Sequence, residues 1–297
     1  MIQVARLGQA DVDAAAGILF DAFGAAYRRR GHAPPFPTRE SAAWLCRAYI
    51  DLDPEGCALA RSSGEVVGVG FAHPRGAVTS IGPLAARPGA PAGVARALMG
   101  ALGDIAGGSS SVRLFQDSFN PDSFGLYTRL GYAVADVAPY LLAEKLEPPP
   151  PGTVNPGVRP LVAGDLPAVE RYDRSRTGAD RRRDLALLAS TGGGFVHEAE
   201  AGGQAIAGYL FYRALPARVV IGPAVAESAE ILAALVDGVA SSLPGRAAVI
   251  RASAAAPLLL RRAFDRGFLV DHLGNLMVRG AYAPPPAQLY ALFPESL

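Results

Sequence analysis

The spacing of hydrophobic and polar residues predicts a mixed α/β chain. Apolar residues recur at helical spacing between residues 10 and 26, among them Val12, Leu19 and Phe23. Short apolar runs bounded by turn formers predict strands instead, and Ser63-Gly64 joins two of them as a hairpin. The first half is expected to hold strands at 2–7, 57–61, 65–72, 77–84 and 111–116, two more within 132–146, and helices at 10–26, 39–51, 91–106 and from 121. This order predicts a mostly antiparallel central sheet flanked by helices.

Four segments of the first half recur in the same order in the second half. Ile-Gly-Pro, for example, stands at 81–83 and again at 221–223. The matching segments are 4–11 with 158–165, 64–71 with 203–210, 81–86 with 221–226, and 126–132 with 262–268. Because repeats in register indicate duplication of a structural unit, we interpret the chain as two copies of one fold.

A run of prolines and glycines separates the two copies. Four consecutive prolines occupy residues 148–151 and favour an extended spacer, since proline can neither continue a helix nor pair in a central strand. The predicted organisation is a first domain at 1–146, a linker at 147–157 and a second domain at 158–297.

Composition excludes several classes of protein. Half of the 297 residues are hydrophobic and the net charge is +1, which argues against a disordered chain and against a nucleic-acid binder. We found no segment apolar enough to span a membrane and no signal peptide. The two cysteines form no CxxC pair and the four histidines are scattered, so we expect no metal. A cytoplasmic protein is the expectation.

The first candidate site is a strand, a loop of small residues and a helix between residues 81 and 99. Ala92, Gly93, Val94 and Ala95 lie at the start of the predicted helix. Small residues let a ligand approach the backbone, and free N–H groups at a helix start bind anions such as a pyrophosphate. An ordinary strand-to-helix turn rich in alanine and glycine explains the same pattern.

The second candidate site is the helix that begins at Asn120. Asn120 and Tyr127 lie about two helical turns apart, on one face of this helix. Helix capping for Asn120 and core packing for Tyr127 are the alternative interpretations.

Together these two segments resemble the GNAT superfamily of acyl-CoA-dependent N-acetyltransferases. Gly93 and Ala95 match the Gly-x-Ala of the family loop, although Ala90 stands where the family has Gln or Arg. Asn120, Tyr127, Gly131 and Tyr132 match the later family segment. The resemblance implies an acetyl-CoA site, in which backbone groups of Ala85 and Ala86 bind the pantetheine arm. Residues 92–95 then hold the pyrophosphate, Asn120 lies near the arm, and Tyr127 protonates the departing thiolate.

The second copy resembles the non-standard C-terminal domain of tandem GNAT-like proteins. Its loop has no glycine and carries Glu227 and Glu230, whose charges repel a pyrophosphate. Ala263 or Phe264 stands where Tyr127 aligns, and neither donates a proton. We therefore expect a degenerate domain that shapes the acceptor site, and one cofactor per chain.

Candidate acceptor-binding residues are Phe23, Tyr27 and His73. His73 follows a predicted strand and is a candidate base, whereas helix packing explains the two aromatic residues equally well. The arginine-rich run at 171–184 is either an anion contact or a solvated helix start balanced by its own aspartates.

These observations predict an acetyl-CoA-dependent N-acetyltransferase that acts by direct attack of an amine on the thioester. The expected acceptor is a small-molecule amine, and the expected state is a monomer or homodimer without nucleic acid or membrane partners. The alternatives are a non-catalytic CoA-binding or ligand-sensing GNAT-like protein, and a scaffold for a partner protein.

Overall fold

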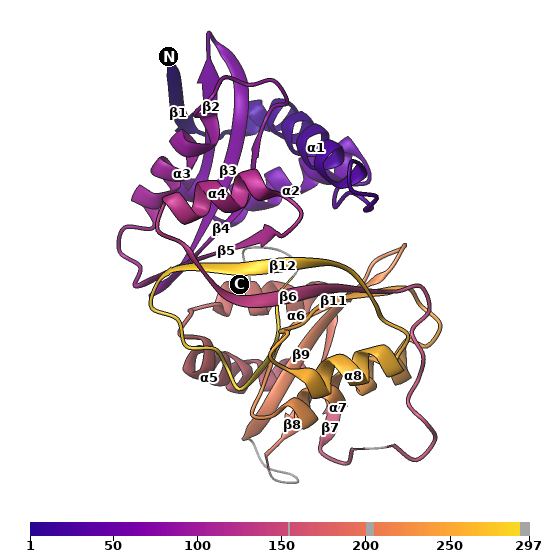
Figure 1. Cartoon of the computed structure of the whole chain (residues 1–297). Coiled ribbons are helices and arrows are strands. Elements are labelled where there is room, and N and C mark those ends of the chain that lie inside the picture. The colour runs from indigo at the N-terminus through magenta and orange to yellow at the C-terminus, as the bar shows by residue number, and fades with distance from the viewer. Residues whose placement is uncertain (154, 200–204, 292–297) are drawn as a thin grey trace. The chain divides into compact units, whose positions relative to one another are not determined.

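The computed structural model describes residues 1–153, 155–199 and 205–291 (Figure 1). The chain forms two compact units. Unit 1 comprises Met1–Ala133 with Val278–Gly280, and unit 2 comprises Val134–Met277 with Ala281–Leu297. The mixed α/β class with a largely antiparallel sheet is confirmed.

Unit 1 follows the predicted order of elements closely. Its strands and helices are β1 (Ile2–Arg6), α1 (Val12–Arg28), α2 (Arg39–Leu52), β2 (Cys57–Ser62), β3 (Glu65–Arg75), β4 (Val78–Ala86), α3 (Val94–Ile105), β5 (Ser111–Asp117) and α4 (Pro121–Arg129). The strands lie in the order β1-β2-β3-β4-β5, antiparallel except for β4 and β5. Ser63 and Gly64 both have positive φ, as a tight hairpin turn requires.

Alternate residues of β3 show which helices cover the two faces of this sheet. A Cβ at Gly68 would lie 2.6 Å from Val94 of α3, so the glycine lets that helix pack closely. Phe71 instead packs edge-on against Tyr49 of α2, with ring centroids 5.1 Å apart. Helix α3 therefore covers one face, and α1 and α2 lie over the other.

Strands β4 and β5 pair only at their beginnings. Their parallel register runs from Val78, opposite Ser111, to Ser80, opposite Arg113. Beyond these residues β4 stays paired with β3, apart from a bulge between Ile81 and Leu84. The far half of β4 consequently has one edge that no strand of unit 1 covers.

Unit 2 repeats this arrangement. Its elements are β6 (Ala133–Ala143), β7 (Val158–Pro160), α5 (Leu166–Thr177), α6 (Arg182–Thr191), β8 (Gly193–Glu198), β9 (Ile206–Ala214), β10 (Val219–Ala226), α7 (Ala229–Ser242), β11 (Ala248–Arg251), α8 (Pro257–Asp265), β12 (Leu269–Gly280) and β13 (Ala287–Leu289). The strands lie in the order β12-β6-β11-β10-β9-β8-β7, with β13 on β10. A bulge lies in β10 between Ile221 and Ala224, matching that of β4. The predicted duplication is visible in this shared order.

The boundary between the units does not lie in the proline linker. Strand β6 precedes the linker, yet it pairs with β11 of unit 2, from Tyr140 opposite Arg251 to Ala143 opposite Ala248 (Figure 1). Conversely, Val278–Gly280 at the end of β12 belong to unit 1, where β12 neighbours β5. Strand β6 of the first half thus belongs to unit 2, and the last three residues of β12 belong to unit 1. For the same reason residues 132–146 hold one strand, where two were predicted.

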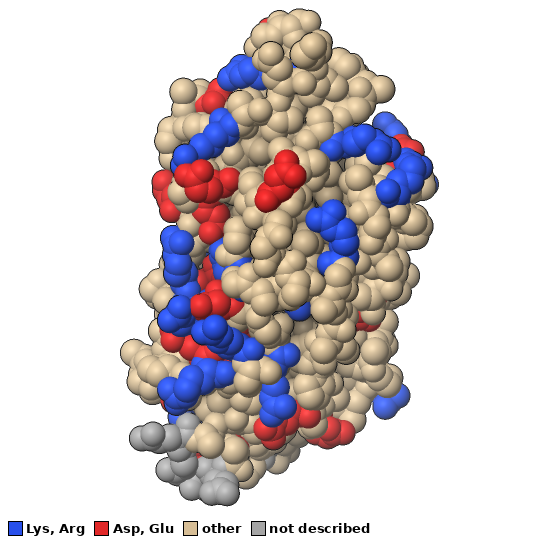
Figure 2. All heavy atoms as spheres, turned by 90° about the vertical axis from the view of Figure 1, so that its left-hand side faces the viewer, with Lys and Arg blue, Asp and Glu red and all other residues tan. Residues whose placement is uncertain are grey.

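Charged side chains of both signs are interleaved on the surface (Figure 2). In the arginine-rich run, Asp180 binds Arg182 at 2.8 Å and Arg174 at 3.8 Å. Arg181 is buried against Asp173 and Tyr209. The run is therefore balanced by its own aspartates, as the second interpretation held, but Arg181 and Asp173 are buried and not solvated. No helix among the described residues is both long and apolar enough to cross a membrane.

Candidate active site

The open edge of β4 presents backbone groups of alternate residues. The N–H of Arg87 donates to Val67 O at 2.9 Å, which directs this residue toward β3. Because successive peptide groups of a strand point to opposite edges, Ala85 also faces β3. Leu84 and Ala86 face the edge from which β5 has separated. The peptide groups available to a ligand are accordingly those of Leu84 and Ala86, whereas the sequence analysis named Ala85 and Ala86.

The open edge of β4 leads to the start of α3. Gly93 is the N-cap of this helix, with φ of 96°, and it has no side chain to cap the first turn. Ala92 and Gly93 are exposed, whereas Val94 is buried and fixes the helix on β3. The first N–H groups of an α-helix lack partners within the helix. The residues predicted from sequence therefore form a helix start whose amides can bind an anion.

Asn120 caps the next helix, α4. Its side-chain Oδ1 accepts from the backbone N–H of Ser123 at 3.3 Å. Gln116 of β5 donates to the carbonyl oxygen of Asn120 at 2.8 Å and to Ser123 Oγ at 3.1 Å. The capping interpretation of Asn120 is confirmed, and its contact with a cofactor stays a prediction. Gln116 was not predicted from the sequence, because no local pattern links a strand residue to a later helix cap.

Tyr127 lies on α4 with 8% of its surface exposed. Burial, and then the charge of Asp117 and the neighbouring Tyr132, raise the pKa of its phenol. Within the described part of the chain its hydroxyl makes no hydrogen bond, although its ring packs edge-on against Tyr132 at 6.2 Å. Tyr127 therefore carries a buried, protonated phenol whose O–H is donated to none of the described residues.

Tyr27 and Phe23 of α1 belong to an aromatic cluster at the end of β5. The hydroxyl of Tyr27 donates to Oδ2 of Asp117 at 2.8 Å. Phe119 packs edge-on against Tyr27 at 5.0 Å and stacks on His32 at 5.1 Å. Phe23 packs against Phe36 at 5.6 Å. The structure thus brings Tyr27 to a carboxylate that the sequence analysis did not single out.

His73 is buried and held by partners within unit 1. It is fully buried within β3, with Nδ1 2.7 Å from Asp53 Oδ2 and Nε2 3.2 Å from Gly82 O. Arg75 donates to both oxygens of the same carboxylate. The prediction of an acceptor-binding role is wrong, because both ring nitrogens are committed to internal partners.

Among the described residues of unit 2, the positions that correspond to Tyr127, Asn120 and Gly93 differ from those of unit 1. Tyr132 N donates to Tyr127 O, and Phe268 N donates to Ala263 O in the same way, so Ala263 is the counterpart of Tyr127. The N-cap of α8 is Ala256, without a capping side chain. Helix α7 begins instead at Ser228, whose hydroxyl accepts from Ile231 N at 3.3 Å. Its first turn is therefore already capped.

The chain's own C-terminal segment also fills the opening between β10 and β11. These strands pair only at Val219 and Val220 of β10, just as β4 and β5 pair only at their beginnings. Strand β13 then pairs with β10 from Ala224 to Ala226, and Tyr290 N donates to Arg251 O at 2.8 Å. The edge that is open in unit 1 is covered by the protein itself in unit 2.

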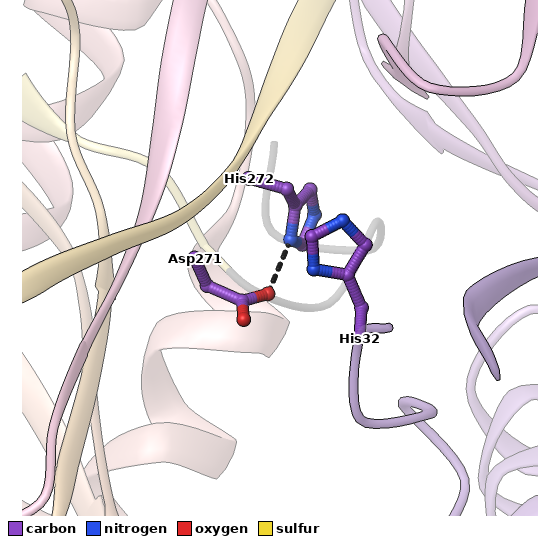
Figure 3. Close-up of side chains that lie close together, drawn as sticks. All are labelled: His32, Asp271 and His272. Atoms are coloured by element: carbon purple, nitrogen blue, oxygen red, sulfur yellow. Dashed lines mark hydrogen bonds and ion pairs between the residues drawn. The ribbon is translucent and has the colours of Figure 1, made fainter. Parts of the chain in front are cut away.

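Histidine 272 is a packed residue of unit 2. Its Nδ1 lies 2.7 Å from Oδ2 of Asp271 (Figure 3), and its ring stacks on Tyr140 at 4.8 Å.

The comparisons with known proteins find the same fold. Residues 169–291 match the model of the acetyltransferase (GNAT) domain family. Unit 2 thus carries a GNAT acetyltransferase domain, and the chain has the fold of tandem GNAT proteins. No protein of curated function matches the sequence.

Solved structures with this fold extend over nearly the whole chain. A candidate acetyltransferase from Pyrococcus horikoshii is 19% identical, with a TM-score of 0.76, covering 99% of this chain and 95% of its own. A GCN5-related N-acetyltransferase from Sphaerobacter thermophilus is 18% identical, with a TM-score of 0.64 and coverage of 95% and 96%. A tandem GNAT protein from the clavulanic acid biosynthesis pathway is 15% identical, with a TM-score of 0.59 and coverage of 95% and 99%. The family match supports acetyl transfer as the class of reaction.

Proposed function

We propose that unit 1 transfers an acetyl group from acetyl-CoA to the amine of a small molecule. One observation carries the proposal: the open edge of β4 leads to a helix start without a side-chain cap at Gly93. An extended amide-containing arm that ends in a pyrophosphate fits this arrangement, since the edge offers peptide groups and the helix start offers an anion site.

The residues of unit 1 fit acetyl-CoA in a defined way. Leu84 and Ala86 would hydrogen-bond the amides of the pantetheine arm through their backbone. The N–H groups that follow Gly93 would hold the pyrophosphate, aided by the helix dipole. When bound, acetyl-CoA supplies the activated thioester carbonyl.

Tyr127 is the proton donor in this proposal. Its raised pKa keeps the phenol protonated near neutral pH. The neutral amine nitrogen attacks the carbonyl carbon, the carbon–sulfur bond breaks, and the Tyr127 hydroxyl protonates the departing thiolate. The proton lost by the amine passes to solvent, so no covalent enzyme intermediate is required.

Two measurements test the proposal. Isothermal titration of the full chain with acetyl-CoA should give saturable binding, which a Gly93→Phe variant should lose. Incubation with acetyl-CoA and a panel of primary amines should then release free thiol and yield acetylated amine. Binding without turnover across the panel would favour the CoA-binding or ligand-sensing alternative, and absence of binding would exclude both functions.

A further inference from the structure

Unit 2 contains a pocket of about 760 Å³ between α7, α8 and the chain that leads from the linker into β7. Ala234 and Gly238 of α7 and Leu258 and Arg262 of α8 are among the residues that line it. Small molecules bind in pockets of about 300–1,000 Å³. We propose that this pocket binds a small organic carboxylate, whose negative charge is held by Arg262. The site involves residues of unit 2 and the adjoining linker alone, and it goes beyond the proposed acetyl transfer.

The guanidinium group of Arg262 keeps one edge available for a ligand. Its Nη1 donates to Oδ2 of Asp237 at 2.8 Å, whereas Nε and Nη2 form no hydrogen bond with any residue that the structure describes. Elsewhere in unit 2, Arg181 uses Nε and Nη2 to bind both carboxylate oxygens of Asp173. Because this edge of the guanidinium matches the spacing of two carboxylate oxygens, Arg262 can bind a second carboxylate while it stays attached to Asp237.

The ion pairs around Asp237 contain one more positive than negative charge. Asp237 also accepts from Nε of Arg266 at 2.6 Å, so a single carboxylate is shared by two guanidinium groups. Asp237 and Arg266 are buried, with 9% and 5% of their side chains exposed, whereas 34% of the Arg262 side chain is exposed. Arg262 is therefore the cation that a ligand in the pocket meets.

Glu230 also lines the pocket, but it lies too far along α7 to cancel this charge. It precedes Asp237 by two helical turns, which corresponds to ~10 Å at a rise of about 1.5 Å per residue. Glu230 is exposed, and salt screens exposed charges over about 8 Å at physiological ionic strength. The part of the pocket at Arg262 consequently attracts an anion.

The remaining walls favour an apolar body on the ligand. Ala234 and Gly238 lie one helical turn apart on α7, and Leu258 and Val158 also line the pocket. Gly238 has no side chain to displace Phe195, whose ring would lie 3.2 Å from a Cβ at this position. Burial of apolar ligand surface contributes about 25 cal/mol per Å². A carboxylate that carries an aromatic or branched aliphatic group therefore matches both parts of the pocket.

A charged probe and a neutral probe of the same shape measure the role of Arg262. Naphthoate carries a carboxylate on a flat apolar body, and naphthamide is its neutral counterpart. In titrations of the full chain followed by NMR, naphthoate should bind more tightly than naphthamide. Arg262→Gln should weaken naphthoate about tenfold, or ~1.4 kcal/mol, and leave naphthamide unchanged. Arg261→Gln removes the same charge from the exposed neighbouring position of α8, and this matched control should change neither affinity.

A second variant tests the location of the site without removing an ion pair. Ala234→Trp places a large ring in the pocket and should abolish binding of both probes, while thermal unfolding reports that the variant is folded. Equal affinity of naphthoate for the parent and for folded Arg262→Gln would overturn the proposal. Unchanged binding to Ala234→Trp, or a parent protein that binds no naphthoate at millimolar concentration, would overturn it as well.

Discussion

At the scale of single residues, the buried charged side chains around Asp53 in unit 1 bind one another and stabilise the fold. Nδ1 and Nε2 of His73 both face acceptors, the carboxylate of Asp53 and the carbonyl of Gly82. An imidazole can satisfy two acceptors only by donating from both nitrogens, so this geometry predicts that both ring nitrogens of His73 carry a proton. With Arg75 it holds Asp53 ionised, and it fixes the bulge of β4 through Gly82.

This protonation state is a prediction that NMR checks directly. Nitrogen-15 spectra of the histidine side chains near pH 7 should show one residue with both ring nitrogens protonated, and His73→Gln should remove that signal. His197→Gln, in unit 2, is the control and should leave it in place. A His73 signal typical of a neutral ring would contradict the assignment.

Replacement of Asp53 by asparagine should destabilise unit 1. Burial alone would raise the pKa of Asp53, but hydrogen bonds from His73 and Arg75 outweigh it and lower the pKa to about 2. A lowered carboxyl pKa stabilises the fold above the ordinary value near 3.8, and this is lost as pH falls toward about 2. This contribution to the free energy of unfolding amounts to about 2 kcal/mol. Leaving two buried cations unpaired raises the expected cost of Asp53→Asn to ~3 kcal/mol.

Urea denaturation at several pH values measures both effects. The parent protein should lose stability between pH 4 and pH 2 more steeply than Asp53→Asn does. Parallel pH profiles of the two proteins would show that this carboxylate is not the group responsible.

Tyr127→Phe tests the proton donor. The substitution removes one oxygen from a buried ring, so the fold and acetyl-CoA affinity should be retained while turnover falls by about 10²-fold. Tyr132→Phe is the matched control on the neighbouring ring, and its hydroxyl has no hydrogen-bond partner among the described residues. Unchanged turnover in Tyr127→Phe on a verified acceptor would exclude the role.

At the scale of elements, the two copies of one strand–turn–helix motif differ at the N-terminus of the helix. Helix α3 starts at Gly93, with no side chain to occupy its first amides, whereas α7 starts at Ser228, whose hydroxyl accepts from Ile231 N. Glu227, expected to repel a pyrophosphate, also forms an ion pair with Arg176 at 2.8 Å. The side-chain cap and the ion pair therefore give the turn before α7 a structural role.

Paired substitutions at the two helix starts test this difference. Gly93→Phe should abolish acetyl-CoA binding, because φ of 96° disfavours any side chain and the ring blocks approach to the amides. Joint replacement of Glu227 and Glu230 by alanine should leave affinity unchanged. Calorimetry decides between the sites, since binding that survives Gly93→Phe would place the cofactor elsewhere.

At the scale of the whole molecule, strand β6 of the first half belongs to unit 2, and the end of β12 belongs to unit 1. The order β12-β6-β11 places a strand of the first copy inside the sheet of unit 2. Proteolytic cleavage within the proline linker should therefore leave two fragments that remain associated, because β6 stays paired with β11. Size-exclusion chromatography should show one species, and separation without denaturant would contradict the exchange.

Because β13 fills the opening in unit 2, the structure predicts how many cofactors each chain binds. With β13 along β10 and Ser228 capping α7, we expect one acetyl-CoA per chain, bound in unit 1. Native mass spectrometry of the full chain should detect a single bound cofactor. Detection of two cofactors per chain would show that the ligand displaces β13.

The sequence by itself determined the features that depend on neighbouring residues. Helical spacing, the Ser63-Gly64 turn, the Asn120 cap and the glycine at the start of α3 are local patterns, and the repeated segments revealed the duplication. The family model matches residues 169–291 of unit 2.

The tertiary structure alone decided which distant segments meet. An alternating strand has the same pattern whichever partner it pairs with, so no local signal showed that β6 would join β11 or that β13 would cover β10. The same holds for side chains: His73 reads as a candidate base until Asp53 and Gly82 take both of its nitrogens. Asp117 acquires its place beside Tyr27 only when residues far apart in the chain pack together, because hydrogen bonds between distant residues leave no spacing to read.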